Sequence, residues 1–200
     1  MRALRWLLAL CGALAVLAAG SAQADVTLTL NLPSTVRNCA DLASTGDSSD
    51  TALAACDRAL AQRSLDYQLR QMLLLNRGII HARRNEAQAA LTDFDAIIAV
   101  NEDNAEAWLN RGVTLMMMDN FGPAIAAFTE ALSLGVQQPH LAYYNRGAAR
   151  EALGDLRGAY EDYSTALEIA PDWGQADAER RRLAERRQEW LGEILVSQNH

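Results

Sequence analysis

Residues 110–128 read NRGVTLMMMDNFGPAIAAF, and the pattern of this stretch occurs in three places along the chain. The opening tripeptide recurs at steps of 34 and 35 residues, as Asn76-Arg77-Gly78, Asn110-Arg111-Gly112 and Asn145-Arg146-Gly147. Twelve residues after each glycine comes an alanine, and four residues later an aromatic residue: Ala90 and Phe94, Ala124 and Phe128, Ala159 and Tyr163. A fixed period of this length is typical of stacked helical hairpins, in which neighbouring units bury a continuous core.

Simple packing arguments explain the spacing. Glycine lets two helices approach closely, so we expect Gly112 to lie opposite Ala124, with the aromatic residue filling the gap between hairpins. Short polar segments provide the turns between helices, at Arg84-Asn85, Asp119-Asn120 and Gly154-Asp155. The arginine before each glycine can pair with a carboxylate, and Asp93 and Asp162 are the candidate partners in the first and third units.

This order of large, small and aromatic residues resembles the tetratricopeptide repeat, in an exported bacterial form that carries Asn-Arg-Gly. The resemblance implies an all-α fold: a right-handed α-α superhelical solenoid of about three and a half hairpins with a C-terminal capping helix. The chain departs from the family at the position before the glycine, where arginine replaces the usual leucine.

The expected organisation begins with a signal peptide at 1–24, followed by an extended segment and a short helix at 25–49. The extended part alternates over Val26–Leu32 as a strand would, and the short helix is expected to begin at Cys39. The remaining segments are a degenerate half repeat at 50–66, three repeats within 67–173 (about 71–104, 105–139 and 140–173), and a capping helix with a tail at 174–200.

The first residues and the composition restrict location and partners. A short positive start, an apolar run and Ala22-Gln23-Ala24 predict a signal peptide cut after Ala24, so we expect a periplasmic or secreted protein without stable membrane insertion. The formal net charge is −7, and all basic residues are arginine. This charge gives no electrostatic basis for binding nucleic acid.

Two cysteines, Cys39 and Cys56, follow the predicted cleavage site. An even number in an exported chain favours a disulfide, and two buried free thiols are the alternative. Neither these cysteines nor the three histidines form a metal-binding, phosphate-binding or nucleophile motif. We therefore expect no catalytic residues, no metal and no cofactor, and we predict that the protein is not an enzyme.

The resemblance places the first helix of each hairpin along a concave groove. The residues expected on that face are Leu75, Asn76, Ile79, Leu109, Asn110, Val113, Met116, Tyr144 and Asn145. The repeated asparagines either bind an extended peptide backbone, since an amide both donates and accepts hydrogen bonds, or bond to a neighbouring helix. The predicted function is a periplasmic scaffold or adaptor that binds a protein or peptide. The alternative is a structural envelope protein that assembles as a homo-oligomer.

Overall fold

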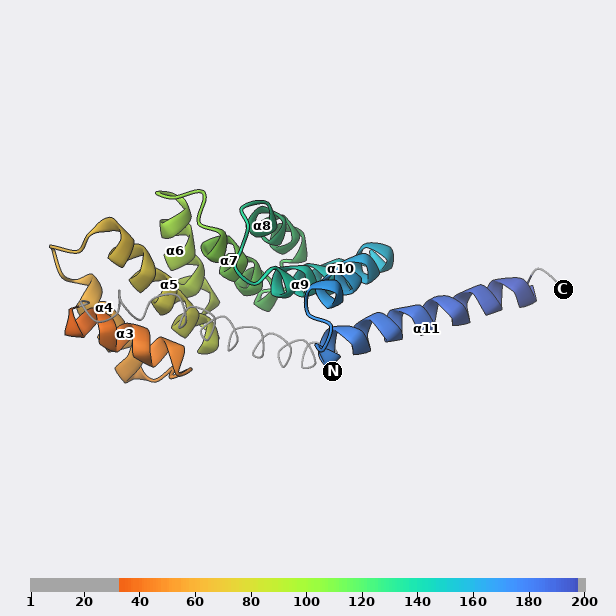
Figure 1. Cartoon of the computed structure of the whole chain (residues 1–200), viewed down its shortest axis with the longest axis horizontal. Coiled ribbons are helices and arrows are strands. Elements are labelled where there is room, and N and C mark those ends of the chain that lie inside the picture. The colour runs from red at the N-terminus through yellow and green to blue at the C-terminus, as the bar shows by residue number, and fades with distance from the viewer. Residues whose placement is uncertain (1–32, 198–200) are drawn as a thin grey trace. The chain divides into compact units, whose positions relative to one another are not determined.

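The computed structural model describes residues 33–197, and within that range every regular element is an α-helix (Figure 1). The predicted signal peptide and the strand-like alternation of Val26–Leu32 lie outside the described residues. The helices are α3 (Ser34–Ser44), α4 (Asp50–Leu60), α5 (Tyr67–Arg83), α6 (Ala87–Ile98), α7 (Ala105–Met117), α8 (Phe121–Ser133), α9 (Pro139–Ala152), α10 (Leu156–Ile169) and α11 (Gly174–Ser197). The predicted all-α solenoid class is confirmed.

The described part of the chain divides into two compact units, one within residues 33–138 and one within residues 139–197. In the first unit, α3 packs on α4, α5 on α6 and α7 on α8, so consecutive helices form three hairpins. The hairpins stack because α4 contacts α5 and α6 contacts α7, with further contacts from α5 to α3 and to α7. The second unit contains the hairpin of α9 and α10, and α11 packs against α10.

Polar side chains and left-handed turns define where the helices begin and end. Ser49, Asp66, Asn104 and Asp155 each accept a hydrogen bond from a backbone N–H in the first turn of the helix that follows. The turns inside the three repeats each have a residue with positive φ at the same phase, namely Asn85 (62°), Asp119 (55°) and Gly154 (87°). These are the turns that the sequence predicted.

Each motif glycine faces the aromatic residue of its own hairpin. A Cβ atom added to Gly112 would lie 2.6 Å from Phe128, and one added to Gly78 would lie 2.6 Å from Phe94. For Gly147, the nearest atom is in Tyr163, at 3.0 Å. The aromatic ring thus fills the space that the missing side chain leaves, and at Gly147 the backbone oxygen of the motif alanine, Ala159, also lies 3.2 Å from the added atom.

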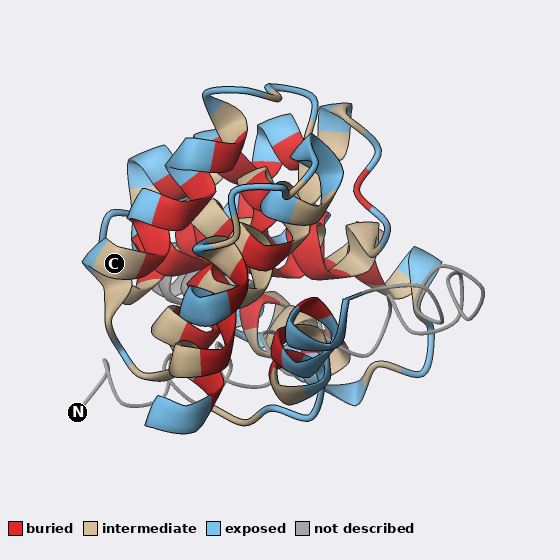
Figure 2. Cartoon of the chain, turned by 90° about the vertical axis from the view of Figure 1, so that its left-hand side faces the viewer, coloured by how far each residue is buried: buried red, intermediate tan, exposed pale blue. Residues whose placement is uncertain are grey.

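The first hairpin is more complete than the sequence suggested. Helix α3 begins at Ser34, before Cys39, because Pro33 directly precedes it and its apolar residues follow a helical spacing. Val36, Cys39 and Ala43 are buried against α4 and α5, and Figure 2 shows buried stretches along the helix faces that turn toward neighbouring helices. The structure contains the disulfide Cys39–Cys56, with 4.7 Å between the two Cα atoms.

Candidate peptide-binding surface

The residues predicted for the groove lie on α5 and α7 of the first unit and on α9 of the second. On α5, Leu75 and Asn76 are half-buried and Ile79 is buried. On α7, Leu109, Asn110, Val113 and Met116 fall on one side of the helix at helical spacing, and all are buried. Because α5 and α7 contact each other, these two sets belong to neighbouring helices of one unit.

Tyr144 and Asn145 are buried on α9, in the second unit. The Tyr144 ring packs against two aromatic neighbours, Tyr163 on α10 at 5.4 Å and Trp173 before α11 at 4.7 Å between ring centroids. Burial, together with the negative charges of Glu179 and Glu151, raises the pKa of the Tyr144 hydroxyl far above its ordinary value. Tyr144 therefore remains a neutral aromatic residue at any physiological pH.

Two of the repeated asparagines have an amide atom without a hydrogen-bond partner among the described residues. Asn110 Nδ2 donates to the backbone oxygen of Glu106 at 2.8 Å, whereas Asn110 Oδ1 is buried and unpaired. In Asn145 it is Nδ2 that is buried and unpaired. Asn110 Oδ1 is thus an unused acceptor in the first unit, and Asn145 Nδ2 is an unused donor in the second; both atoms are enclosed by neighbouring residues.

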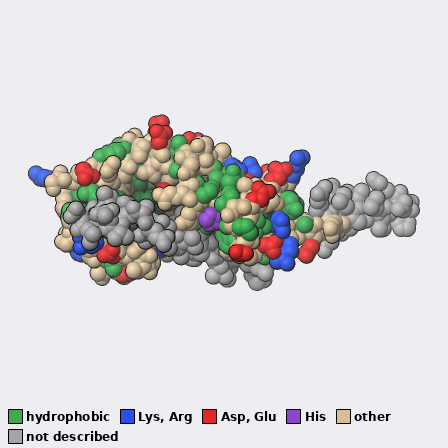
Figure 3. All heavy atoms as spheres, viewed as in Figure 1, with side chains coloured by type: hydrophobic (Ala, Val, Ile, Leu, Met, Phe, Trp, Pro, Cys, Tyr) green, Lys and Arg blue, Asp and Glu red, His purple; other side chains and the backbone are tan. Residues whose placement is uncertain are grey.

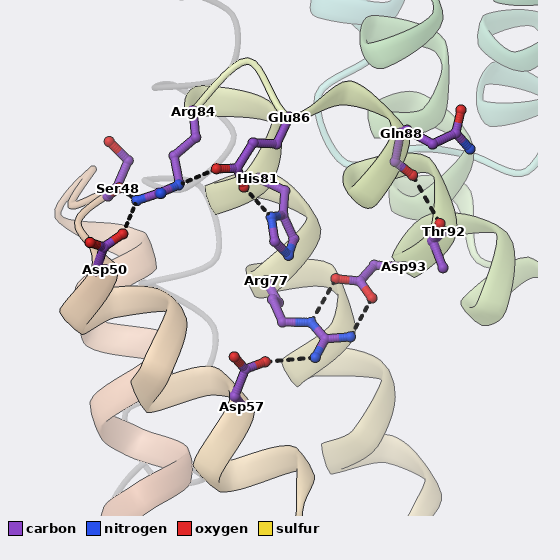
Figure 4. Close-up of polar contacts among 10 residues, drawn as sticks. All are labelled: Ser48, Asp50, Asp57, Arg77, His81, Arg84, Glu86, Gln88, Thr92 and Asp93. Atoms are coloured by element: carbon purple, nitrogen blue, oxygen red, sulfur yellow. Dashed lines mark hydrogen bonds and ion pairs between the residues drawn. The ribbon is translucent and has the colours of Figure 1, made fainter.

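The arginines of the repeated motif bind carboxylates and so hold the hairpins together. Arg77 makes two hydrogen bonds to Asp93, Nε to Oδ2 at 2.9 Å and Nη2 to Oδ1 at 2.6 Å, and Nη1 binds Asp57 of α4 at 2.7 Å (Figure 4). The hydrogen bond to Asp93 raises the pKa of Arg77 above its ordinary value. The predicted partnership with Asp93 is confirmed, and the contact with Asp57 joins this hairpin to the preceding one.

The two other motif arginines pair in the same way. Arg146 binds Asp162 through Nε at 3.0 Å and Nη2 at 2.7 Å, as the sequence predicted. Arg111 has no aspartate at the equivalent position and instead binds Asp95 of α6 at 2.7 Å. On the face in Figure 3, arginine and acidic side chains are interspersed. These arginines therefore serve the fold, and they are not available as a cationic clamp for an anionic ligand.

A second polar cluster joins the turn between α5 and α6 to the loop between α3 and α4. Arg84 binds Glu86, Asp50 and the backbone oxygen of Ser48, and His81 Nδ1 lies 2.6 Å from Glu86 Oε2 (Figure 4). The hydrogen bond from Arg84, followed by that from His81, lowers the pKa of Glu86. His81 is thus one member of a structural network.

His140 packs edge-on against Trp173, with 5.3 Å between ring centroids, and burial lowers its pKa. Within the part of the chain that the structure describes, no group of three or more histidine, cysteine or acidic side chains could hold a metal ion. In the same part, no helix is both long and apolar enough to cross a membrane.

Glu106 was missed in the sequence-based list of groove residues. It lies in the first turn of α7, one helical turn before Asn110 and on the same side of the helix. Its Oε1 accepts a hydrogen bond from the backbone N–H of Gln137 at 2.9 Å, and burial raises its pKa. The repeat pattern could have identified Glu106. The residue four positions before each of the other two repeated asparagines is apolar, Met72 or Leu141, so an acidic residue at this position is an exception.

Comparison with known proteins agrees with this geometry. Two models of the tetratricopeptide repeat match the chain, one over residues 105–134 and one over residues 140–172. The first tetratricopeptide repeat of Spaghetti (RPAP3), bound to the HSP90 peptide SRMEEVD, is 25% identical with a TM-score of 0.57, over 62% of this chain and 98% of that one. The second such domain of human RPAP3, in complex with the HSP70 peptide SGPTIEEVD, is 25% identical with a TM-score of 0.55, over 58% and 97%.

A third similar structure, MamA, covers more of the chain. It is 20% identical with a TM-score of 0.60, over 81% of this chain and 97% of MamA, and it supports the fold alone. The repeat matches, the stacked hairpins and the packing of glycine on an aromatic ring all agree. Residues 105–134 and 140–172 of the chain therefore match the tetratricopeptide repeat.

Proposed function

We propose that this chain is a non-catalytic scaffold that binds an extended peptide segment of a partner protein along the first helices of its hairpins. The observation that carries the proposal is the pair of unpaired amide atoms, Asn110 Oδ1 and Asn145 Nδ2, on side chains that are 1% and 2% exposed. A buried polar atom without a partner costs about 1–3 kcal/mol. In the first unit a peptide N–H on Asn110 would remove that cost, and in the second unit a peptide carbonyl on Asn145 would do so.

The side chains around these asparagines suit the same ligand. Leu75 and Asn76 on α5 are half-buried, so they keep surface that a ligand could cover. The two RPAP3 domains were solved with peptides, which supports peptide binding as the use of this fold. In the present chain the motif arginines already form ion pairs with carboxylates. We therefore propose that the asparagine side-chain amides recognise the backbone of the peptide.

The test is peptide selection followed by substitution. The chain from Asp25 onward would be used to select peptides from a random library, and affinities would be measured by fluorescence polarisation. The triple variant Asn76→Ala, Asn110→Ala and Asn145→Ala should keep its helical circular dichroism and bind the selected peptides at least tenfold more weakly. Asn38→Ala, an exposed change on α3, is the matched control.

Two results would contradict the proposal. If the triple variant loses its helical signal while single variants bind normally, the asparagines are structural. If it folds and binds with unchanged affinity, the peptide site lies elsewhere.

We also propose that the protein acts in the periplasm or outside the cell. The support is the sequence alone: the charged start, the apolar run and the small residues that end at Ala24. Cell fractionation and N-terminal sequencing of the exported protein test this, and a mature chain that retains Met1 in the cytoplasm would refute it.

Self-assembly is the second candidate, and one observation favours it. In the second unit, Leu153, Leu156 and Tyr160 are 59%, 39% and 41% exposed around the tip of the α9–α10 hairpin. Exposed apolar groups of this kind favour association. Light scattering over a range of concentrations separates the two ideas, because a protein that stays monomeric while it binds peptide is not a structural oligomer.

A further inference from the structure

Glu106 is an acidic residue at a position where the repeat pattern calls for an apolar one. The equivalent residues are Met72 in the preceding hairpin and Leu141 in the following one. Leu141 is buried and Met72 is half-buried, so the position belongs to the lining of the hairpin and not to its solvated surface. A carboxylate costs more to place there than the apolar residue it replaces.

The Glu106 carboxylate is half-buried and has no arginine partner among the described residues. One oxygen accepts the N–H of Gln137, and none of the ion pairs among the described residues includes Glu106. By contrast, three acidic side chains that are less than a tenth exposed each form an ion pair with an arginine: Asp93, Asp162 and Glu151. Burial raises the pKa of Glu106, as expected for a carboxylate that lacks a neighbouring cation.

Asn110 adds a second acceptor on the same side of α7. Its Nδ2 is fixed on the Glu106 backbone oxygen at 2.8 Å, which holds the amide beside the Glu106 turn. Its Oδ1 is buried and has no partner among the described residues. The half-buried Glu106 carboxylate and the unpaired amide oxygen of Asn110 therefore belong to residues one helical turn apart on α7.

We infer that Glu106 and Asn110 form a subsite for a basic side chain of the bound peptide, with arginine preferred. This inference rests on the proposed function and names the chemistry of the partner. The planar guanidinium has five N–H donors in a fixed fork, so it can reach a carboxylate and an amide oxygen at once. The formal net charge of −7 adds a long-range attraction for a basic segment.

The experiment uses the peptides selected against the unmodified chain. Those that bind should be enriched in arginine, and replacing that arginine by citrulline, which has nearly the same shape without the charge, should weaken binding about tenfold. In Glu106→Gln the citrulline effect should fall to less than about twofold, because glutamine still accepts from Gln137 but carries no charge. The control Glu130→Gln removes an equal charge from an exposed site on α8 and should keep the full citrulline effect.

The outcomes separate this inference from the proposed function. Peptides that bind through the asparagines with no arginine preference overturn the subsite and leave the scaffold in place. Failure to select any peptide overturns both. The citrulline comparison is made on the unmodified protein, so an effect below about twofold there overturns the subsite even if Glu106→Gln does not fold.

Discussion

Gly112→Ala tests the packing on which the whole hairpin arrangement depends. The added Cβ would lie 2.6, 2.7 and 3.0 Å from three atoms of the Phe128 ring, which is fully buried. Ordinary contacts begin near 3.4 Å, so the ring must move by nearly 1 Å inside a closely packed core. Such overpacking costs about 1–3 kcal/mol, whereas alanine gains up to about 1 kcal/mol over glycine in helix propensity.

A matched substitution separates these two effects. Gly174 begins α11, and nothing lies within 4 Å of a Cβ added there, so Gly174→Ala should be neutral or slightly stabilising. We expect Gly112→Ala to be less stable than Gly174→Ala by about 1–3 kcal/mol. For a chain of this size, that corresponds to a melting temperature lower by roughly 2–4 °C per kcal/mol.

The assay is thermal and urea unfolding followed by circular dichroism, with the disulfide intact in every variant. A second comparison, in a Phe128→Leu background, should reduce the cost of Gly112→Ala, since the ring atoms that clash are gone. If Gly112→Ala is as stable as Gly174→Ala, the Phe128 ring does not occupy this space, and the assignment of the glycine to the hairpin contact is wrong.

Three further predictions concern the polar contacts and the disulfide. Asp93→Asn should cost about 2–4 kcal/mol, because the half-buried guanidinium of Arg77 loses its buried carboxylate and keeps only the exposed Asp57 as an ion-pair partner among the described residues. Asp95→Asn, at an exposed pair, should cost under about 1 kcal/mol. Equal costs in urea titrations would contradict this. Replacing both Cys39 and Cys56 by alanine removes a cross-link that stabilises the fold by about 3 kcal/mol. Amide hydrogen exchange should therefore accelerate first in α3 and α4, and unchanged exchange rates in these helices would contradict the prediction. Burial raises the pKa of Glu106, so the folded state holds that proton more tightly than the unfolded chain, and this stabilising contribution is lost as the pH rises from the ordinary value of 4.5 through the raised pKa. Glu106→Gln should abolish that loss and be at least as stable as the parent at neutral pH, a result that urea midpoints across this pH range would check.

Much of the fold could be predicted from residues that determine local structure or that recur at the same position of each repeat. The turns at Asn85 and Asp119 follow from short polar side chains that tolerate positive φ. The pairing of Arg146 with Asp162 was predictable because two helices of a hairpin fix the distance between their repeated positions. The groove residues were predicted from their position within each repeat alone, and their role in binding stays a prediction.

Other features required the folded chain. The partner of Arg111, Asp95, lies at no repeated position, and the contact of Arg77 with Asp57 joins two different hairpins. The atoms nearest to a side chain added at Gly112 belong to the Phe128 ring, and the ring's orientation depends on the packing of both helices.

Sequence periodicity alone thus determined the class of fold, the hairpin turns and two of the three arginine pairs, since each depends on spacing within one repeat. Only the tertiary structure decided which buried groups remain unpaired. Glu106 and Asn110 look like ordinary surface residues in the sequence. That Asn110 Oδ1 has no partner among the described residues is visible only after every neighbouring donor has been placed, because satisfaction of a buried polar atom depends on residues from several helices at once.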